Sequence, residues 1–478
     1  MWNPAGTTIT MAGIDVMTTR WTLESLAAAA AEVDARIPQY ADAGLLHRHD
    51  DGSFAPDSLH RLRLIQFARS RGFGDEQLLA AARGQGDLLS VFDEADYGVS
   101  DVDLRSAARE DGLNDAVITE LAGILQWNTD LAGTESDAAA LHVVARALEL
   151  GMPQDALMQL VRIFADAMDR LADAEVRTFH NYVHERFRAE GLAGPELLEA
   201  TDRVGRPVLD LAEPAVTYFH RRAYQRAIRE DLLRHLAEAT HPTAATPGEE
   251  QATVLFVDLA SFTPLTATMG DLRAAEVLSR LSIMVRSHAS RHGGRILKQI
   301  GDAFMLMFAQ PVDAVRFGLD IGRFVDTEPQ FPALHIGAQC GNVLYRDGDY
   351  VGATVNLAAR VAGSGAAGQF LITEMLRDAV RDIEDADFVL LPPRRLKGIP
   401  DPVRLVEVRH HNPEGSNRET DPVCGMLLHP GDVVSRSEWQ GKSFAFCNDI
   451  CREAFDEDPR RFVAEPHHSS SSRTEHSR

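Results

Sequence analysis

The chain has 478 residues, 45% of them hydrophobic and 25% charged, and a formal net charge of -23 at pH 7. This length predicts two to four domains of ordinary globular composition, and the acidic balance argues against nonspecific nucleic-acid binding, which needs a basic surface. No apolar run approaches the roughly 20 residues of a membrane span and no signal peptide opens the chain, so we expect a cytoplasmic protein without a membrane partner.

The first half of the chain is predicted to be all-α. Residues 1–21 are expected to be a flexible start, and residues 22–238 are rich in Ala, Leu, Arg and Glu with apolar residues at helical spacing. We expect eight to ten helices and no convincing strand, with breaks at Gly151, at 191–194 and at 205–207.

A stretch near the start suggests DNA binding as an alternative function. Residues 39–46, followed by 59–67 and Gly72-Phe73, resemble the helix-turn-helix of MerR-type regulators. Arginines and aspartates are mixed here, whereas a DNA-binding face carries a net basic stripe. A helical interaction domain is therefore the default interpretation, and a nucleotide-responsive transcription regulator is the alternative.

A second stretch of the helical half carries two histidines. Residues 170–188 resemble the N-terminal regulatory domain of some actinobacterial adenylate cyclases and contain His180 and His184, one helical turn apart. Because an unperturbed histidine has a pKa of about 6.5, the pair could sense pH near neutrality. The alternative is two half-exposed histidines on an amphipathic helix. Residues 239–250 are predicted to be a linker, with two prolines and small polar side chains.

An acid follows the first predicted strand of the second half. The apolar run 252–257 ends in Asp258, which is typical of a buried strand that delivers a carboxylate to a sheet edge. Residues 259–263 then turn into a helix whose first N–H groups form a phosphate cradle, because free amides and the helix dipole both favour anions. An acid beside an anion site indicates a metal–phosphate complex with Mg²⁺. A lone aspartate here would more often be a helix N-cap.

A second acid lies at the tip of a predicted hairpin. Apolar residues run up to Lys298 and resume at Phe304, so two strands meet at Gly301-Asp302. Glycine accepts the positive φ that such a turn demands. The hairpin alone predicts no function.

Four motifs in a fixed order carry a family resemblance. Together they resemble the class III nucleotidyl cyclase catalytic domain, which implies an α+β, ferredoxin-like fold with a mixed antiparallel sheet over residues 251–410. The family's catalytic unit is a dimer. The motifs are residues 256–263, 298–304, 348–360 and 396–403.

The resemblance implies roles for a first set of residues. Asp258, Leu259 and Asp302 correspond to ligands of two Mg²⁺ or Mn²⁺ ions, of which one activates the ribose 3′-hydroxyl and the other steadies the triphosphate. Lys298 and Asp349 correspond to the pair that reads the purine. The lysine would donate to adenine N1 and the aspartate would accept from the exocyclic amine, which favours ATP over GTP.

Further roles are implied for the helix and loops that follow. Asn356 would orient the ribose and Arg360 would neutralise charge at the α-phosphate, since residues four apart share a helix face. Phe262, Thr263 and Lys397 are implied as further substrate contacts. Every key position is filled, which implies an active adenylate cyclase that forms 3′,5′-cyclic AMP and pyrophosphate. Since one chain carries both halves of the family's site, a homodimer is expected.

The end of the chain forms a separate small module. After a linker over 411–419, residues 420–465 resemble a YHS domain, and residues 466–478 are predicted to be disordered. The chain is therefore expected to be multidomain, with an all-α half, an α+β catalytic domain and this cysteine-containing module.

Three cysteines of the last module suggest a second metal site. Cys424, Cys447 and Cys451 offer soft ligands suited to Zn²⁺ or Cu⁺, with water, His429 or a partner residue as the fourth ligand. Reduced cysteines packed as small hydrophobes are the alternative, with equal weight. A metal or redox sensor is the function that this module would support.

Overall fold

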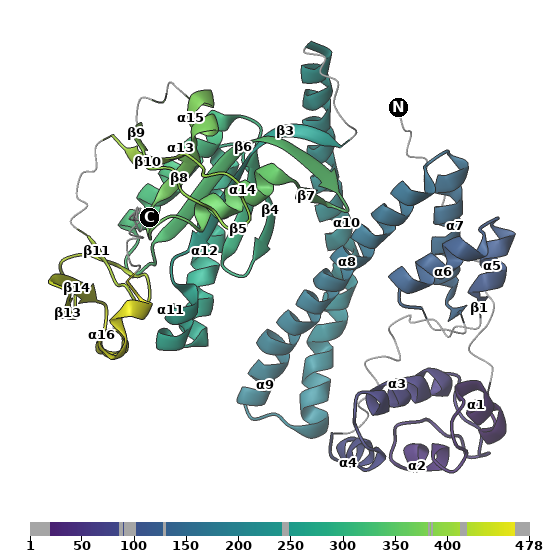
Figure 1. Cartoon of the computed structure of the whole chain (residues 1–478). Helices are drawn as coiled ribbons and strands as arrows, with labels where there is room; N and C mark the ends of the chain where they lie inside the picture. The colour runs from purple at the N-terminus through teal and green to yellow at the C-terminus, as the bar shows by residue number, and fades with distance from the viewer. Residues whose placement is uncertain are drawn as a thin grey trace, which may run out of the picture. The chain divides into compact units, whose positions relative to one another are not determined.

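The computed structural model describes residues 20–85, 102–127, 131–240, 248–380, 386–411 and 418–463, together with Leu89 and Ile383. The chain splits into two compact units, Met1–Pro242 and Thr243–Arg478 (Figure 1). Among the described residues, none of the helices combines the length and apolar character that crossing a membrane would need.

The first unit is helical where it is described, as expected. Its helices form two clusters with separate cores, one around Leu26, Tyr40 and Leu62 and one around Leu104 and Leu141. The helices are α1 (Leu23–Ala30), α2 (Ile37–Asp42), α3 (Ser58–Ser70), α4 (Asp75–Gln85), α5 (Leu104–Glu110), α6 (Asp115–Ile124), α7 (Glu135–Glu149), α8 (Gln154–Phe179), η3 (His180–His184), α9 (Glu185–Ala189) and α10 (Gly194–Thr240).

One continuous helical rod consists of α8, η3 and α9. It starts after Gly151 and ends before Gly191, and both glycines have a positive φ, 91° and 95°. The breaks predicted at these glycines are therefore confirmed, because the left-handed conformation ends a helix. Within the rod, η3 is a single π-helical turn, a feature that is frequent at functional sites.

The predicted absence of strands in this half is wrong. Strands β1 (Val102–Asp103) and β2 (Ala132–Gly133) form a short antiparallel pair. A Cβ on Gly133 would lie 2.4 Å from Leu104 Cδ1, so the pairing depends on a close approach between distant segments. Two residues are too few to show the alternating pattern by which a strand is recognised in a sequence.

The break predicted at 205–207 is also wrong, because α10 continues through Pro207 and Pro214. Gly205 marks a close approach rather than a helix end, since a Cβ there would lie 3.2 Å from Phe179 Cζ on α8. An interior proline costs about 3 kcal/mol in a helix, so a break is what local propensity predicts at these positions.

The second unit is organised around a mixed eight-stranded sheet of order β4-β5-β3-β6-β8-β10-β9, with β7 paired to β6. The pair β6 and β8 is parallel and the other pairs are antiparallel, which confirms the predicted fold class. The strands are β3 (Glu249–Leu259), β4 (Arg295–Ile300), β5 (Ala303–Phe308), β6 (Leu334–Arg346), β7 (Asp349–Val351), β8 (Phe370–Thr373), β9 (Ala386–Leu390) and β10 (Leu405–His410).

Helices cover both faces of this sheet. On one face, α12 and α13 pack against a core that includes Leu255 and Val257, and on the other α14 packs against Val254 and Met305. Because side chains alternate along a strand, Asp258 lies on the same face as Val254, the face of α14. The helices are α11 (Phe262–Met269), α12 (Asp271–Arg291), α13 (Pro311–Thr327), α14 (Ala353–Ala362) and α15 (Glu374–Ala379).

The C-terminal module packs onto the second unit and shares a core with it. Phe446 and Phe455 of the module cluster with Leu265 of α11 and Ala274 of α12. A module this small buries little apolar surface alone, so the shared core stabilises it. Its elements are β11 (Glu419–Thr420), β12 (Leu427–Leu428), β13 (Ser435–Trp439), β14 (Lys442–Phe446), α16 (Asp449–Glu457) and η4 (Pro459–Arg461).

Candidate active site and a cysteine cluster

Two carboxylates meet where β3 ends. Asp258 is the last residue but one of β3, and Asp302 lies in the two-residue turn between β4 and β5. The turn uses Gly301 with a φ of 62°, as predicted. Since Val257 pairs with Phe304, this turn is brought to the end of β3 by the pairing of β3 with β5.

The two carboxylates form a site that a cation would stabilise. Burial, together with the charge and hydrogen bond of Asp302, raises the pKa of Asp258 to about 7. The Oδ1 atom of Asp258 is buried without a hydrogen-bond partner. Because a buried carboxylate oxygen without a donor is costly, and hard cations prefer oxygen ligands, this pair fits Mg²⁺ or Mn²⁺.

The segment after β3 turns sharply into α11. Ser261, its N-cap, has a φ of 58°, and Phe262 and Thr263 are the first two residues of the helix. The first N–H groups of a helix have no acceptor within it, so these amides are available to an anion. The predicted phosphate cradle therefore lies beside the carboxylate pair.

The predicted purine-reading residues form an ion pair. Lys298 of β4 binds the Asp349 carboxylate on β7, although the two are 51 residues apart. The other oxygen of Asp349 accepts from the backbone N–H of Tyr350 at 2.8 Å. The two side chains are 35% and 40% exposed, so a ligand can reach both. Lys298 pairs with Met305, which places it on the α14 face.

The remaining predicted residues lie on α14 and in a loop. Asn356 and Arg360 are exposed on one side of α14, and Lys397 is exposed between β9 and β10. In the described part of the chain, Asn356 and Arg360 form no hydrogen bond or ion pair with Asp258 or Asp302. Within one chain, Asp258 meets Asp302 and Lys298 pairs with Asp349. Neither pair is hydrogen-bonded to Asn356 or Arg360 of α14 in the described part of the chain.

The three cysteines of the last module meet, together with an aspartate that sequence reasoning missed. One ligand atom from each of Asp421, Cys424, Cys447 and Cys451 lies within 4.8 Å of the others. His429, one of the three fourth ligands that the sequence left open, lies outside this group. Asp421 precedes Pro422 and is typical of a turn, so only its position near the later cysteines identifies it.

Hydrogen bonding within this cluster shifts the pKa values of its thiols in opposite directions. Hydrogen bonds from Cys424 and Cys447 lower the pKa of Cys451 to about 3, and hydrogen bonds to the other two thiols raise the pKa of Cys424. Burial raises the pKa of Asp421. The Sγ atoms are 3.5 Å apart for Cys424 and Cys447, and 3.8 Å for Cys447 and Cys451. Thiolates about 2.3 Å from a tetrahedral Zn²⁺ would be about 3.8 Å apart, so the sulfur spacing fits such a metal.

The two histidines of the helical half stack within η3. The ring centroids of His180 and His184 are 4.9 Å apart, with planes 16° from parallel. His180 Nε2 lies 3.5 Å from Glu185 Oε1, and His184 Nδ1 lies 3.3 Å from the Thr201 hydroxyl of α10.

The MerR-like stretch folds as α2 and α3, and two arginines of α3, Arg61 and Arg69, are paired with acids. Arg61 is buried and its Nε lies 2.8 Å from Asp57, while Arg69 contacts Glu32 and Asp75 at 2.6 and 3.2 Å. This pairing reduces the positive charge that the face can offer to a phosphate backbone.

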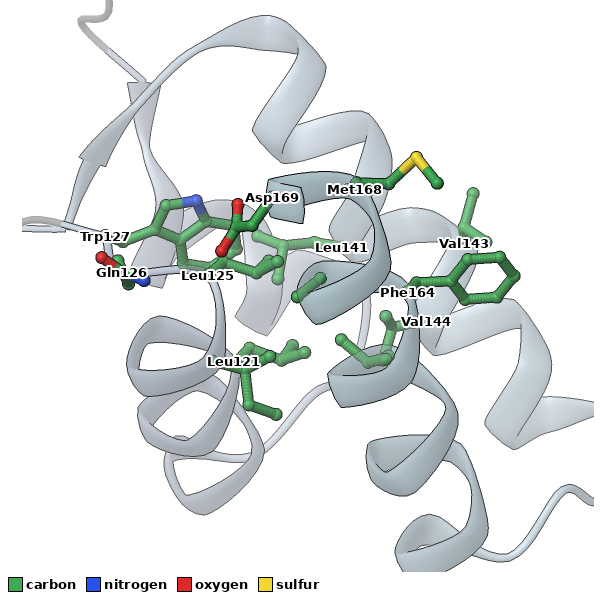
Figure 2. A pocket seen from close by; sticks show the side chains of 14 residues that line it. Leu121, Leu125, Gln126, Trp127, Leu141, Val143, Val144, Phe164, Met168 and Asp169 are labelled. Atoms are coloured by element: carbon green, nitrogen blue, oxygen red, sulfur yellow. The ribbon is translucent and has the colours of Figure 1, made fainter. Parts of the chain in front are cut away.

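A cavity of about 830 Å³ lies in the helical half among α6, α7 and α8. Figure 2 shows Trp127, Leu141 and Phe164 around it, and Asp169 is the acid in its lining. None of the residues predicted as site residues lines it.

Comparisons with known proteins match both the sheet domain and the C-terminal module to known families. Residues 245–400 match the model of the adenylate and guanylate cyclase catalytic domain, and residues 420–465 match that of the YHS domain. The pH-sensitive adenylate cyclase MT1302 of Mycobacterium tuberculosis is 30% identical over 345 residues, which cover 67% of this chain and 82% of that protein. This overlap is longer than the whole second unit, so it includes part of the helical half.

Other similarities are more distant. An adenylate cyclase of Streptomyces coelicolor is 26% identical over 230 residues, covering 48% of this chain and 57% of that protein. The crystal structure of the adenylyl cyclase CyaB from P. aeruginosa covers 34% of this chain and 94% of its own, at 23% identity and a TM-score of 0.31, which is too low to support an argument. On the family matches and the first relative, the chain belongs to the class III adenylate and guanylate cyclase family and carries a C-terminal YHS domain.

Proposed function

We propose that this protein converts ATP to 3′,5′-cyclic AMP and pyrophosphate in a homodimer. The observation that carries the proposal is the half-buried pair of Asp258 and Asp302 beside the first turn of α11, on the sheet face that also carries Lys298. A carboxylate pair with one buried oxygen that has no hydrogen-bond partner, next to free helix amides, suits a metal bound to a triphosphate.

The carboxylate pair and the first turn of α11 would bind the charged end of the substrate. Asp258 and Asp302, with the backbone carbonyl of Leu259, would hold two Mg²⁺ or Mn²⁺ ions. When bound, these ions favour ionisation of the ribose 3′-hydroxyl and neutralise phosphate charge. The backbone amides of Phe262 and Thr263 would donate to phosphate oxygens.

The purine and the reacting phosphate would be bound by the other residues. Lys298 would donate to adenine N1 and Asp349 would accept from the exocyclic amine, so adenine would insert into their ion pair. Asn356 would orient the ribose, and Arg360 would stabilise the charge that develops at the α-phosphate. Lys397 would contact the distal phosphates.

A symmetric dimer would complete two sites. Asn356 and Arg360 are exposed, and within the described residues they form no hydrogen bond or ion pair with the carboxylates of their own chain. A second copy that faces α14 would bring these side chains to the partner's carboxylates, and symmetry would repeat this at a second site.

The direct test is product formation by the purified full-length protein. With Mn²⁺ or Mg²⁺, ATP should yield cyclic AMP and pyrophosphate in equal amounts, and GTP should be turned over more slowly. Absence of cyclic AMP with either metal, in a folded dimer, would overturn the proposal. Sedimentation of the active species tests the dimer.

The cysteine cluster would hold a soft metal, Zn²⁺ or Cu⁺. Three thiols and one carboxylate are a ligand set that hard cations such as Mg²⁺ do not prefer. This site is separate from the residues proposed for catalysis.

The helical half would regulate the enzyme, with His180 and His184 sensing pH. The two rings stack on each other within η3, and their nitrogens lie 3.5 Å from Glu185 Oε1 for His180 and 3.3 Å from the Thr201 hydroxyl for His184, so a change of charge at either ring would alter η3. We expect a protein with both His180→Gln and His184→Gln to show a flatter dependence of kcat on pH between 5.5 and about 8.

The matched control for this prediction is His142→Gln. His142 is an exposed histidine of α7 that contacts Asp111 at 3.0 Å, away from η3. Activity measured against pH for the wild type, the control and a chain that lacks residues 1–245 separates the effects. An unchanged profile in the double variant would exclude these histidines as the sensor.

A further inference from the structure

The loop that carries the cysteine cluster touches the strand that carries the metal-binding aspartate. Gly425, the residue after Cys424, packs against Ala260, two residues beyond Asp258. A Cβ on Gly425 would lie only 2.3 Å from the Ala260 carbonyl oxygen, and Gly425 has a φ of 73°. The contact is therefore backbone against backbone, and only glycine permits it.

Hydrogen bonds join the same two segments through Ala333. The N–H of Ala333 donates to the Gly425 carbonyl at 2.8 Å, and the Ala333 carbonyl accepts from the N–H of Ala260 at 2.8 Å. Gly425 in turn donates its N–H to the Asp421 carbonyl at 2.9 Å. A movement of the loop 421–425 must therefore move the end of β3 or break these bonds.

A second connection leads from the cluster to α11. The Cys451 side chain lies beside the Thr268 hydroxyl of α11, and that hydroxyl donates to the Pro264 carbonyl of the same helix at 3.0 Å. Leu265 of the same helix belongs to the hydrophobic core that includes Cys424 and Cys451. The cluster therefore contacts both elements that form the proposed metal–phosphate site, namely the end of β3 and α11.

The ligand set of the cluster favours zinc. Asp421 is fully buried, and its carboxylate accepts N–H groups from Val423 at 2.9 Å and from Cys447 at 2.9 Å, which hold it in place. A fixed carboxylate with three thiols supplies four ligands, as tetrahedral Zn²⁺ requires, whereas Cu⁺ prefers sulfur alone.

We propose that Asp421, Cys424, Cys447 and Cys451 form a zinc site whose occupation is linked thermodynamically to metal–nucleotide binding at Asp258 and Asp302. Zinc holds the loop 421–425 in the conformation that supports Ala260 and α11, so it strengthens nucleotide binding. Linkage is reciprocal, and the nucleotide strengthens zinc binding by the same factor. The identity of the nucleotide rests on the proposed function.

The test measures zinc affinity in the full-length, reduced protein. Metal-free protein is titrated with Zn²⁺ against a chromophoric chelator in excess Mg²⁺, with and without a non-hydrolysable ATP analogue. We expect one zinc per chain and a Kd that is at least about 5-fold lower with the analogue. The Kd of the analogue, measured by calorimetry, should fall by the same factor when zinc is bound.

Two variants test the route of the linkage. The linkage factor is the zinc Kd without the ATP analogue divided by the zinc Kd with it. In Gly425→Ala, the added Cβ displaces Ala260 while all four ligands remain, so zinc should bind but this linkage factor should approach 1. Should that variant fold poorly, Thr268→Val removes the α11 hydroxyl that lies beside Cys451 and should also lower the linkage factor. Cys340→Ser is the matched control, because Cys340 lies on β6 outside the cluster and should leave stoichiometry and factor unchanged.

The outcomes distinguish this inference from the cyclase proposal. The inference is overturned if no zinc binds, or if the ATP analogue leaves the zinc Kd of the wild type unchanged. It is also overturned if the analogue lowers the zinc Kd of both Gly425→Ala and Thr268→Val as much as that of the wild type. Linkage seen with Cu⁺ and not with Zn²⁺ would overturn the choice of metal. Cyclic AMP formation is assayed separately, so a failed linkage leaves that proposal standing, and a linkage without cyclic AMP overturns that proposal alone.

Discussion

Replacing Asp302 by alanine is expected to lower kcat for cyclic AMP formation by at least about 10³-fold. The variant removes one of the two carboxylates that would hold the catalytic metals, and metal stabilisation of the transition state is worth several kcal/mol. Each 1.36 kcal/mol corresponds to a factor of about ten in rate. The measurement is the initial rate of cyclic AMP release at saturating ATP and Mn²⁺.

The matched control is Asp271→Asn, an exposed aspartate at the start of α12, which should keep wild-type activity. A second readout excludes misfolding. Because burial and Asp302 raise the pKa of Asp258 from 3.8 to about 7, the folded metal-free protein binds a proton that the unfolded chain releases. Its free energy of unfolding therefore falls as pH rises from 3.8 to about 7, and Asp302→Ala should reduce this fall.

Thermal unfolding against pH, without divalent ions, measures this second effect. If Asp302→Ala is less stable than the wild type at pH 8, this would contradict the interpretation that the charge of Asp302 disfavours the charged form of Asp258. Full activity in a stable Asp302→Ala protein would instead contradict the assignment of Asp302 as a metal ligand.

Replacing Lys298 by methionine is expected to lower the ratio of kcat/KM for ATP to that for GTP by about 10–100-fold. The variant removes the donor to adenine N1 and leaves the Asp349 carboxylate without its partner, and an unpaired group in a binding site costs about 1–3 kcal/mol. Most of the change should be a loss with ATP. Competition between the two nucleotides in one reaction measures the ratio directly.

Lys442→Met is the control for this prediction. Lys442 is an exposed lysine at the start of β14, away from the nucleotide site, and its replacement should leave the ratio unchanged. Equal losses with ATP and GTP in Lys298→Met would mean that Lys298 supports the fold or the phosphates and does not read the purine.

The carboxylate pair could be predicted because each aspartate lies in a motif of the family resemblance, and the local pattern placed each one at the end of a strand. A strand that ends in Asp258 and a hairpin with Gly301-Asp302 at its tip are short-range features, and the observed pairing of β3 with β5 brings them together. Asp421 could not be predicted in this way. Its relation to Cys447 and Cys451 depends on how a turn, a hairpin and α16 fold against one another, which no local period records.

The continuous course of α10 through Pro207 and Pro214 could not be predicted from local sequence either. The sequence predicts a break there because each proline removes a backbone donor. The structure nevertheless continues the helix, and beside the first proline Gly205 approaches Phe179 of α8 closely. This approach joins two segments of the chain, so no local pattern records it.

The sequence by itself determined the helical character of the first half, through the periodicity of its apolar residues, and the family, through its ordered motifs. The resemblance carried by those motifs implied the mixed sheet of the second half and the carboxylate and ion-pair residues. Only the tertiary structure decided which distant side chains meet. It placed Asp421 among the cysteines, stacked His180 on His184, and set Gly425 against Ala260. Such contacts arise because separate elements bury a common core, and no single segment of the chain contains that information.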